Sequence, residues 1–380
     1  MAMELQDLNR SLQTFPIPDS IRRHIEAVFW PEDDEPDPDS DHNLKDRPST
    51  NYYFEAHYSP RCQHYAREGG QHISVKTHSD IAQIAGWILD DATRGAIRVR
   101  LLDHATTTTT TSLTPDGEAV VSTDRSKAIE TSIDMAANLL AMVECGKQGR
   151  FVFSGRNAIL WERGESLRSC LGKRFDPVKT TKLDPRNLRL VKGFTGRSLT
   201  RIGGIKIKWT TNLVDHLLLT DDDQTVFVFQ CAAYLMMQRK SPNKIFPPFL
   251  IDETIRTLAL LFPQNNSQTK SWLKSQTDTQ GKPLDPALGK CGSLRTEERR
   301  FENFSFWRDR LIILKEAYDD HRPKTMAQWW FDRRNGEQWY TFWIAVMVFI
   351  VAVGFGVIQS VTGILQVVVS YKALEGDSGG

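Results

Sequence analysis

Several absences narrow the functions that this chain of 380 residues can have. Its 48 basic and 47 acidic residues leave a net charge of only +1, which excludes the strongly basic surface that nucleic-acid binding normally needs. The five cysteines are scattered and never form a Cys-x-x-Cys pair, a usage typical of reduced thiols facing the cytosol rather than of a disulfide framework. We therefore expect no nucleic-acid partner.

Phosphate-binding loops and secretion signals are also absent. The glycines between Gly164 and Lys173 are too far apart for a phosphate-binding loop, and Gly354-Phe355-Gly356 lies inside an apolar run. The first residues, Met1 to Phe15, lack the basic region and apolar run of a secretory signal. The sequence predicts no cofactor, and it predicts synthesis in the cytosol with the apolar run emerging last.

Charge is missing altogether from Trp339 to Tyr371, where no Asp, Glu, Lys or Arg occurs. As a helix, the part from Trp339 to Ile358 would reach about 30 Å, the thickness of the hydrocarbon core of a bilayer. Its many Ile, Val and Phe residues favour insertion. We predict a transmembrane helix over 339–371, with Trp339 and Trp343 at its start. A buried core helix of a large soluble domain is the alternative.

Basic residues are more frequent before this segment than after it. Arg322, Lys324, Arg333 and Arg334 precede it closely, whereas only Lys372 follows it, in a short tail over 372–380. This bias predicts a tail-anchored, single-pass protein with its large N-terminal part in the cytoplasm.

Aromatic and basic residues gather over 323–338, just before the predicted span. The juxtamembrane anchor consists of Trp329, Trp330, Arg333 and Arg334. Such side chains favour the headgroup layer of a membrane, so we expect the lipid bilayer to be a partner of this segment.

Small residues recur on one face of the predicted span. Ala352, Gly356 and Ser360 repeat every four residues, and Gly363 continues the face, an arrangement that lets two membrane helices approach closely. Polar residues continue the same stripe, namely Gln359, Thr362, Gln366 and Ser370. We predict association with a second copy, or with another membrane protein, through this face. A kinked anchor lying partly in the interface is the alternative.

The residues before the span divide into segments by composition. We expect an N-terminal region over 1–50 with an acidic, disordered loop, a soluble α+β domain over 51–263, a polar linker over 264–295, and an amphipathic helix over 296–322. In that helix, Phe304, Trp307, Leu311, Leu314 and Tyr318 recur at steps of three and four. The helix is expected either to pack on the soluble domain or to self-associate.

The α+β class rests on helices interspersed with strands, without the regular spacing of a parallel sheet. Helices are predicted over 21–30, 79–95, 124–145 and 247–263, with a short one over 212–219. Strands are predicted over 72–76, 96–102, 204–209 and 225–230, and a hairpin over 150–153 and 158–161.

Two clusters of residues could in principle bind a metal or act in catalysis. The histidines His42, His57, His64, His72 and His78 lie near Cys62, but their spacing follows no zinc-ligand template, so solvated or hydrogen-bonded histidines are expected. Asp215 and His216, near Asp221–Asp223, could supply a general base with an orienting carboxylate, although a run of aspartates is typical of a solvated turn. We predict no catalytic residue, no metal site and no enzyme activity.

Four segments of the C-terminal half, 201–219, 249–264, 295–319 and 329–366, resemble an uncharacterised family of filamentous-fungal proteins with a C-terminal membrane segment. This resemblance implies no known activity. The last segment is also distantly similar to fungal CorA-like proteins, which implies a cation channel with two spans joined by a Gly-Met-Asn loop. No Gly-Met-Asn occurs here, and residues 358–371 would have to form a short, polar second span.

These observations predict a membrane-anchored cytosolic module that binds an unidentified ligand or partner and oligomerises through its transmembrane helix. A subunit of a CorA-like cation channel or transporter is the first alternative. A membrane-tethered metalloenzyme using the histidines between His42 and His78 is the second.

Overall fold

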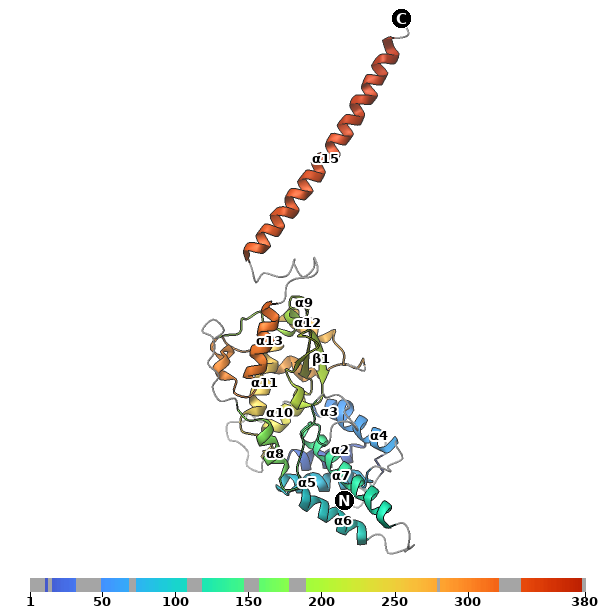
Figure 1. Ribbon diagram of the computed structural model, residues 1–380, viewed down its shortest axis with the longest axis vertical. Coiled ribbons are helices and arrows are strands. Elements are labelled where there is room, and N and C mark those ends of the chain that lie inside the picture. Colours follow the sequence, from blue (N-terminus) through green and yellow to red (C-terminus); the bar gives the residue numbers. More distant parts are fainter. Residues whose placement is uncertain are drawn as a thin grey trace. The chain divides into compact units, whose positions relative to one another are not determined.

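The computed structural model of the protein describes residues 11–12, 16–31, 49–67, 73–107, 118–146, 157–177, 189–278, 281–320 and 336–377. The chain divides into two compact units, residues 1–321 and 322–380. Within the described residues, the first unit combines helices with a small sheet, and the second contains one long helix (Figure 1). The predicted α+β class, with a C-terminal helix long enough to span a membrane, is confirmed.

The N-terminal half of the first unit is helical. Its elements are α2 (Asp19–Phe29), α3 (Asn51–Tyr53), the π-helix η2 (Phe54–Tyr58), α4 (Ser59–Arg67), α5 (His78–Leu89), α6 (Arg94–Thr107), α7 (Glu118–Ala141) and α8 (Leu167–Arg174). α5 packs on both α2 and α7, with their apolar stripes buried between them. α5 starts one residue before the helix predicted over 79–95. Thr77 caps it, because its hydroxyl accepts the Asp80 N–H while the Asp80 carboxylate accepts the Thr77 N–H.

Residues 96–102, predicted as a strand, lie in α6. Ile97 is buried whereas Val99 is 53% exposed, so these two β-branched residues do not share a face as they would in a strand. On the helix, Arg94 and Arg98 lie one turn apart, and both pair with Glu130 of α7. The strand prediction was wrong because contacts with α7, which is distant in the sequence, outweigh the local β propensity.

The hairpin predicted over 150–153 and 158–161 is also wrong in its described part. Residues 150–156 lie outside the described residues, and 158–161 contains no strand. Ile159 instead forms an isolated bridge to Cys145, and its N–H donates to the carbonyl of Glu144 at 2.7 Å. Residues 73–76, predicted as extended, likewise form no strand.

A three-stranded sheet lies in the C-terminal half of this unit. Its order is β1 (Lys206–Thr210), β3 (Thr225–Phe229) and β2 (Leu219–Thr220). β3 pairs in parallel with β1 and antiparallel with β2, and all five of its residues are buried, which explains its uninterrupted apolar run. The strands predicted over 204–209 and 225–230 are confirmed. The helix predicted over 212–219 is only the 3-10 turn η4 (Leu213–Asp215).

Helices surround this sheet. They are α9 (Gly196–Arg201), α10 (Ala232–Lys240), α11 (Leu250–Leu261), α12 (Ser267–Lys274) and α13 (Arg308–Asp320), with the 3-10 turns η5 (Pro286–Lys290), η6 (Glu297–Arg299) and η7 (Phe301–Asn303). α10 packs on α11, and α12 packs on α9 at one end of the unit (Figure 1).

The polar segment 264–295 is not a linker. Its described residues belong to the first compact unit and include α12 and η5. Leu273, Leu284 and Leu288 are buried, and the Asp285 carboxylate accepts the N–H of Ala233 at 2.7 Å, which ties this segment to the start of α10. The composition misled the prediction because a few buried leucines, spaced by turns, fix an otherwise polar segment.

The helix predicted over 296–322 begins later, at Arg308, after two 3-10 turns. The five apolar residues predicted to share a face, Phe304, Trp307, Leu311, Leu314 and Tyr318, are all buried. Packing on the folded unit, rather than self-association, therefore explains this pattern. The helix starts late because the N–H groups just before it bind the Glu253 carboxylate of α11.

Candidate functional sites

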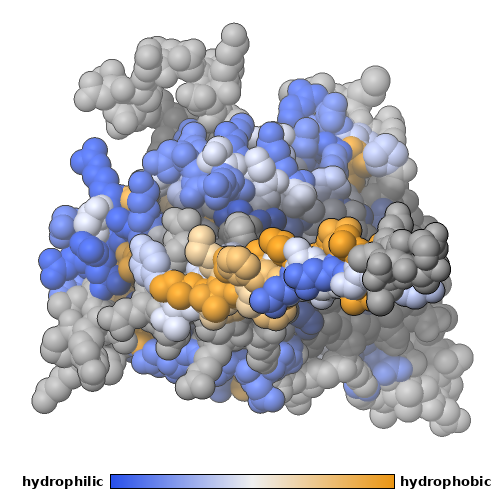
Figure 2. Space-filling model, turned by 90° about the horizontal axis from the view of Figure 1, so that it is seen from above, coloured by the Kyte–Doolittle hydropathy of each residue, from blue (hydrophilic) through white to orange (hydrophobic). Residues whose placement is uncertain are grey.

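The long helix α15 (Gly336–Asp377) contains the segment Tyr340–Tyr371, which is long and apolar enough to cross a membrane and is not buried at all. It is the sole helix of this kind within the described residues. Figure 2 shows hydrophobic residues dominating its surface, whereas hydrophilic residues dominate the visible surface of the first unit. Residues 358–371 continue the same helix, so they form no second span as a CorA-like arrangement would need.

The small and polar residues of α15 form one face. Ala352, Gly356, Gln359, Gly363, Gln366 and Ser370 follow one another at steps of four, three, four, three and four. This spacing keeps all six on one side of a helix, and we call it the seam. A Cβ added at Gly356 or Gly363 would meet nothing within 4 Å, so the seam is open.

The polar side chains on and beside the seam differ in their hydrogen bonding. Ser360 donates to the carbonyl of Gly356 at 2.9 Å, and Thr362 donates to that of Ile358 at 3.0 Å, so both hydroxyls are satisfied within the helix. The side-chain amides of Gln359 and Gln366 form no hydrogen bond with the part of the chain that the structure describes. These two amides remain available to a second helix.

The other predicted membrane residues are only partly described. Trp343 lies in α15, where its ring packs edge-on against Phe342. Trp339 lies in the same helix, but its side chain is outside the described residues. The juxtamembrane residues Trp329, Trp330, Arg333 and Arg334 also lie outside them.

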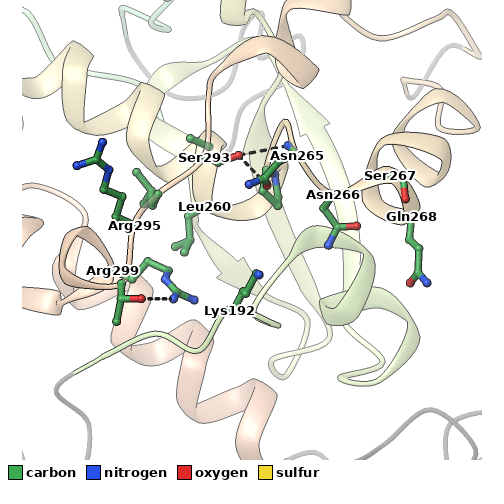
Figure 3. Close-up of a pocket in the computed structure, with 13 residues that line it drawn as sticks. Lys192, Leu260, Asn265, Asn266, Ser267, Gln268, Ser293, Arg295 and Arg299 are labelled. Carbon is green, nitrogen blue, oxygen red and sulfur yellow. Dashed lines mark hydrogen bonds between the residues drawn. The ribbon is translucent and has the colours of Figure 1, made fainter.

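A second candidate site is a pocket of about 710 Å³ in the first unit, which we call the basic pocket (Figure 3). It lies between the end of α11, the start of α12, the segment 293–299 and the loop that carries Lys192. Its lining is Lys192, Ala259, Leu260, Pro263, Asn265, Asn266, Ser267, Gln268, Ser293, Leu294, Arg295, Thr296 and Arg299. No acidic residue is among these lining residues.

Local hydrogen bonds fix the walls of the basic pocket. The Ser293 hydroxyl donates to Asn265 Oδ1 at 2.9 Å and accepts the Asn265 N–H at 3.3 Å, which joins the two sides. The carbonyl of Arg299 accepts the N–H of Leu190 at 2.9 Å, which brings the loop of Lys192 alongside. The pocket is therefore assembled from segments far apart in the sequence.

Only some of the hydrogen-bond donors of the Arg299 guanidinium have partners. Its Nη2 donates to the Thr296 hydroxyl at 3.3 Å, whereas its Nε and Nη1 are shielded from solvent and have no hydrogen-bond partner in the described structure. Figure 3 shows the Arg299 and Lys192 side chains extending toward the same space, while Arg295 points away from it. Two cationic groups thus face one cavity.

An adjoining pocket shares Ser267 and Gln268 with the basic pocket and adds Arg197 and Arg201 of α9. Arg197 donates to Gln268 Oε1 at 2.9 Å. Burial, and then the neighbouring Arg201, lower the pKa of Arg197. Cations therefore crowd this end of the unit.

A larger cavity, of about 1280 Å³, lies between the start of α2, α3 and the segment 282–290. Its charged lining is mixed, with Arg22, Lys282 and Lys290 beside Glu55 and Asp285. The Asp285 carboxylate is occupied by the N–H groups of Ala233 and Ala287, so it serves the fold. The lining of this cavity indicates no single ligand class.

The histidine cluster does not form a metal centre in the described structure. His57 is buried, with Nε2 3.2 Å from the carbonyl of Asn138, and the Nδ1 of buried His78 is 3.0 Å from the Tyr58 hydroxyl. Burial raises the pKa of the Cys62 thiol. Among the described residues, no group of three potential ligands converges; His42 and His72 lie outside them.

The Asp215–His216 pair does not form a catalytic base either. Asp215 accepts hydrogen bonds from the side chains of Asn157 and Asn212. His216 Nδ1 accepts the Phe229 N–H at 3.2 Å, so its Nε2 carries the proton donated to the Thr257 hydroxyl at 2.7 Å. Burial, together with Arg310, lowers the pKa of His216 to about 3, and the imidazole is thus a neutral core group.

Asp221, Asp222 and Asp223 all have positive φ angles and form the turn between β2 and β3. This agrees with the turn that a run of aspartates indicates.

Sequence reasoning missed the basic pocket. Its cations come from two separate segments, and the polar residues of its wall were interpreted as a linker. The one signal available was the cluster of basic residues at Arg295, Arg299 and Arg300 after that polar stretch.

Compared with known proteins, the chain matches no protein-family model, no curated protein and no solved structure, so the resemblance to a fungal family stays a prediction.

Proposed function

We propose that this protein is anchored in a membrane by α15 and that its folded first unit acts as a binding module on the cytosolic side. The observation that carries this proposal is the uncharged, unburied surface of Tyr340–Tyr371. A monomeric soluble protein rarely exposes an apolar patch of more than a few hundred Å², and this helix exposes apolar side chains along its whole length. Lipid is the environment that such a surface fits.

The cytosolic orientation rests on the basic residues that precede the span and on their scarcity after it. Two Asn-x-Ser sites of the first unit, at Asn265 and Asn303, offer a direct test, because a lumenal domain would expose them to glycosylation. We expect both to stay unmodified in cells with a secretory pathway. In the same cells, full-length protein should remain in the membrane pellet after carbonate extraction. Release into the supernatant would contradict the anchor.

We further propose that two copies associate through the seam of α15. In lipid, an unsatisfied side-chain amide is unfavourable. Gln359 and Gln366 lie one heptad apart on the seam, and their amides form no hydrogen bond with the described residues. The small residues between them would let a second helix approach closely enough for amide-to-amide hydrogen bonds.

Two glycines of α15 provide a matched test. Gly356 lies on the seam, whereas Gly354 lies two residues away on a different face, and a side chain meets no obstacle within 4 Å at either position. Gly356→Ile should therefore weaken association in detergent or bilayers, measured by crosslinking or energy transfer between labelled copies. Gly354→Ile should leave it unchanged. Equal effects of both substitutions would exclude the seam as the interface.

A further inference from the structure

We propose that the basic pocket binds a phosphate-bearing anion through Lys192 and Arg299. This proposal goes beyond the anchor and the seam, and it does not depend on either. It rests on the charge of the lining, the unsatisfied donors of Arg299 and the size of the cavity.

The charge of the lining is one-sided. The chain as a whole has nearly equal numbers of basic and acidic residues, yet the basic pocket and the adjoining pocket hold Lys192, Arg197, Arg201, Arg295 and Arg299 and no Asp or Glu. Within the described residues, neither Lys192 nor Arg299 forms a salt bridge. Lys192 and Arg299 face one cavity and repel each other, so an anion bound between them would stabilise this part of the unit.

The available donors suit an oxyanion with several acceptors. Arg299 lines the pocket, and two donors of its guanidinium, Nε and Nη1, lack hydrogen-bond partners in the described structure. Lys192 is exposed, and its ammonium group extends toward the same space as the Arg299 side chain. The Asn266 side chain faces the same cavity, but its Oδ1 already accepts the N–H of Thr269. A phosphate offers oxygens in several directions and can accept hydrogen bonds from an arginine and a lysine at once.

The cavity is larger than one phosphate ion. A volume of about 710 Å³ lies in the range of small-molecule sites, so the cavity can hold a phosphorylated sugar or headgroup.

The location of the basic pocket in the first unit is also informative. Lys192 lies two residues before Phe194, whose ring packs against Tyr318 in the last turn of α13. The pocket is therefore near the point where the chain leaves this unit and continues to α15.

Binding can be measured with full-length protein in detergent micelles and inositol trisphosphate as the probe. We expect wild-type protein to bind it, with a Kd that rises as salt is added. Lys192→Gln and Arg299→Gln should each raise the Kd about tenfold, the value of one charge-assisted contact. Because Lys192 is exposed, its replacement should not disturb folding. Absence of binding by wild-type protein would overturn the proposal.

Arg300→Gln is the matched control. Arg300 follows Arg299 directly, but it pairs with Glu297 and Glu302 and does not line the pocket. We expect this substitution to change the Kd by less than about twofold, as for a surface residue outside the site. If it weakened binding as much as Arg299→Gln, the effect would be one of net charge and the assignment of the pocket would be wrong.

The source of the phosphate can be separated in a second experiment, which rests on the proposed anchor. Full-length protein is placed in phosphatidylcholine nanodiscs with or without phosphatidylinositol phosphate, and amine labelling of Lys192 is compared with and without soluble inositol trisphosphate. Protection by the lipid assigns a headgroup ligand, and protection by the soluble compound alone assigns a free one. Protection by neither would overturn the proposal. A failed anchor would be recognised separately, as protein lost from the nanodiscs while soluble binding persists.

Discussion

The Glu253 carboxylate of α11 accepts the backbone N–H of Trp307 at 2.8 Å, just before α13 begins. It also accepts the N–H groups of Ser305 and Phe306, at 2.6 and 2.8 Å. One buried side chain on α11 thus satisfies three donors ahead of a second helix, and it fixes where α13 starts.

Replacing Glu253 should destabilise the fold. Glu253→Ala leaves three N–H groups without their acceptor, so we expect the free energy of unfolding to fall by about 2–4 kcal/mol. Glu253→Gln keeps one acceptor oxygen and should cost less, about 1–2 kcal/mol. Chemical denaturation measures both values. Glu316→Gln, at an exposed position of α13, serves as the control and should stay within about 0.5 kcal/mol of wild type.

The buried ion pair between Arg61 and Glu144 gives a second prediction. Arg61 Nη1 donates to the Glu144 carboxylate at 3.2 Å, and both residues are more than nine-tenths buried. Arg61→Met should cost about 3–5 kcal/mol, because it leaves a buried carboxylate without a partner. The double variant Arg61→Met/Glu144→Gln should recover part of that loss. A double variant as unstable as the sum of the two single variants would show that the ion pair contributes no coupling.

Acid should destabilise the protein through its buried histidines. Burial lowers the pKa of His78 to about 4, and burial together with nearby arginines lowers those of His57 and His216 to about 3. These values lie below the ordinary value near 6.5, so the unfolded chain binds protons more readily than the folded one as the pH falls. The contribution of these three neutral histidines to the free energy of unfolding should therefore be fully present above about pH 6.5. Below that pH it should decline, by up to about 1.4 kcal/mol per pH unit for each histidine. Denaturation at a series of pH values measures this slope, and an unchanged stability at pH 5 would contradict the burial of neutral imidazoles.

Asp285 should have the opposite effect from the histidines on stability in acid. Burial raises its pKa to about 6, against the lowering effect of its backbone donors. The folded state therefore holds this proton more tightly than the unfolded state, and stability rises as the pH falls from about 6 to about 4. Asp285→Asn removes that gain, so the variant should lose stability in acid more steeply than wild type. Parallel slopes for the two proteins over this window would show that the Asp285 pKa is not raised.

Local signals were sufficient for some elements and not for others. The runs at 225–230 and 204–209 are strands because alternating or continuous apolar residues are buried on a sheet, and this pattern is visible in the sequence. Residues 96–102 have a similar local preference, but the pairing of Arg94 and Arg98 with Glu130 makes them helical. The role of Glu253 was also hidden, because nothing near it in the sequence shows that it meets Trp307.

Of the candidate sites, likewise, one could be predicted from the sequence and another could not. The apolar segment before Tyr371 and the positions of Ala352, Gly356 and Gly363 follow from composition and period alone. The basic pocket does not, because Lys192 and Arg299 become neighbours only when Leu190 pairs with the backbone of Arg299.

The length of α15 has a consequence for where the protein would reside. Tyr340–Tyr371 comprises 32 residues, which measure about 48 Å along a helix axis, whereas a bilayer interior is about 30 Å thick. Fitting that length entirely inside would require a tilt of about 50°, beyond the roughly 40° at which membrane helices are found. In the proposed anchored state, the excess must protrude or thicken the surrounding lipid. Hydrophobic mismatch would then sort this protein toward the thickest bilayers of the cell.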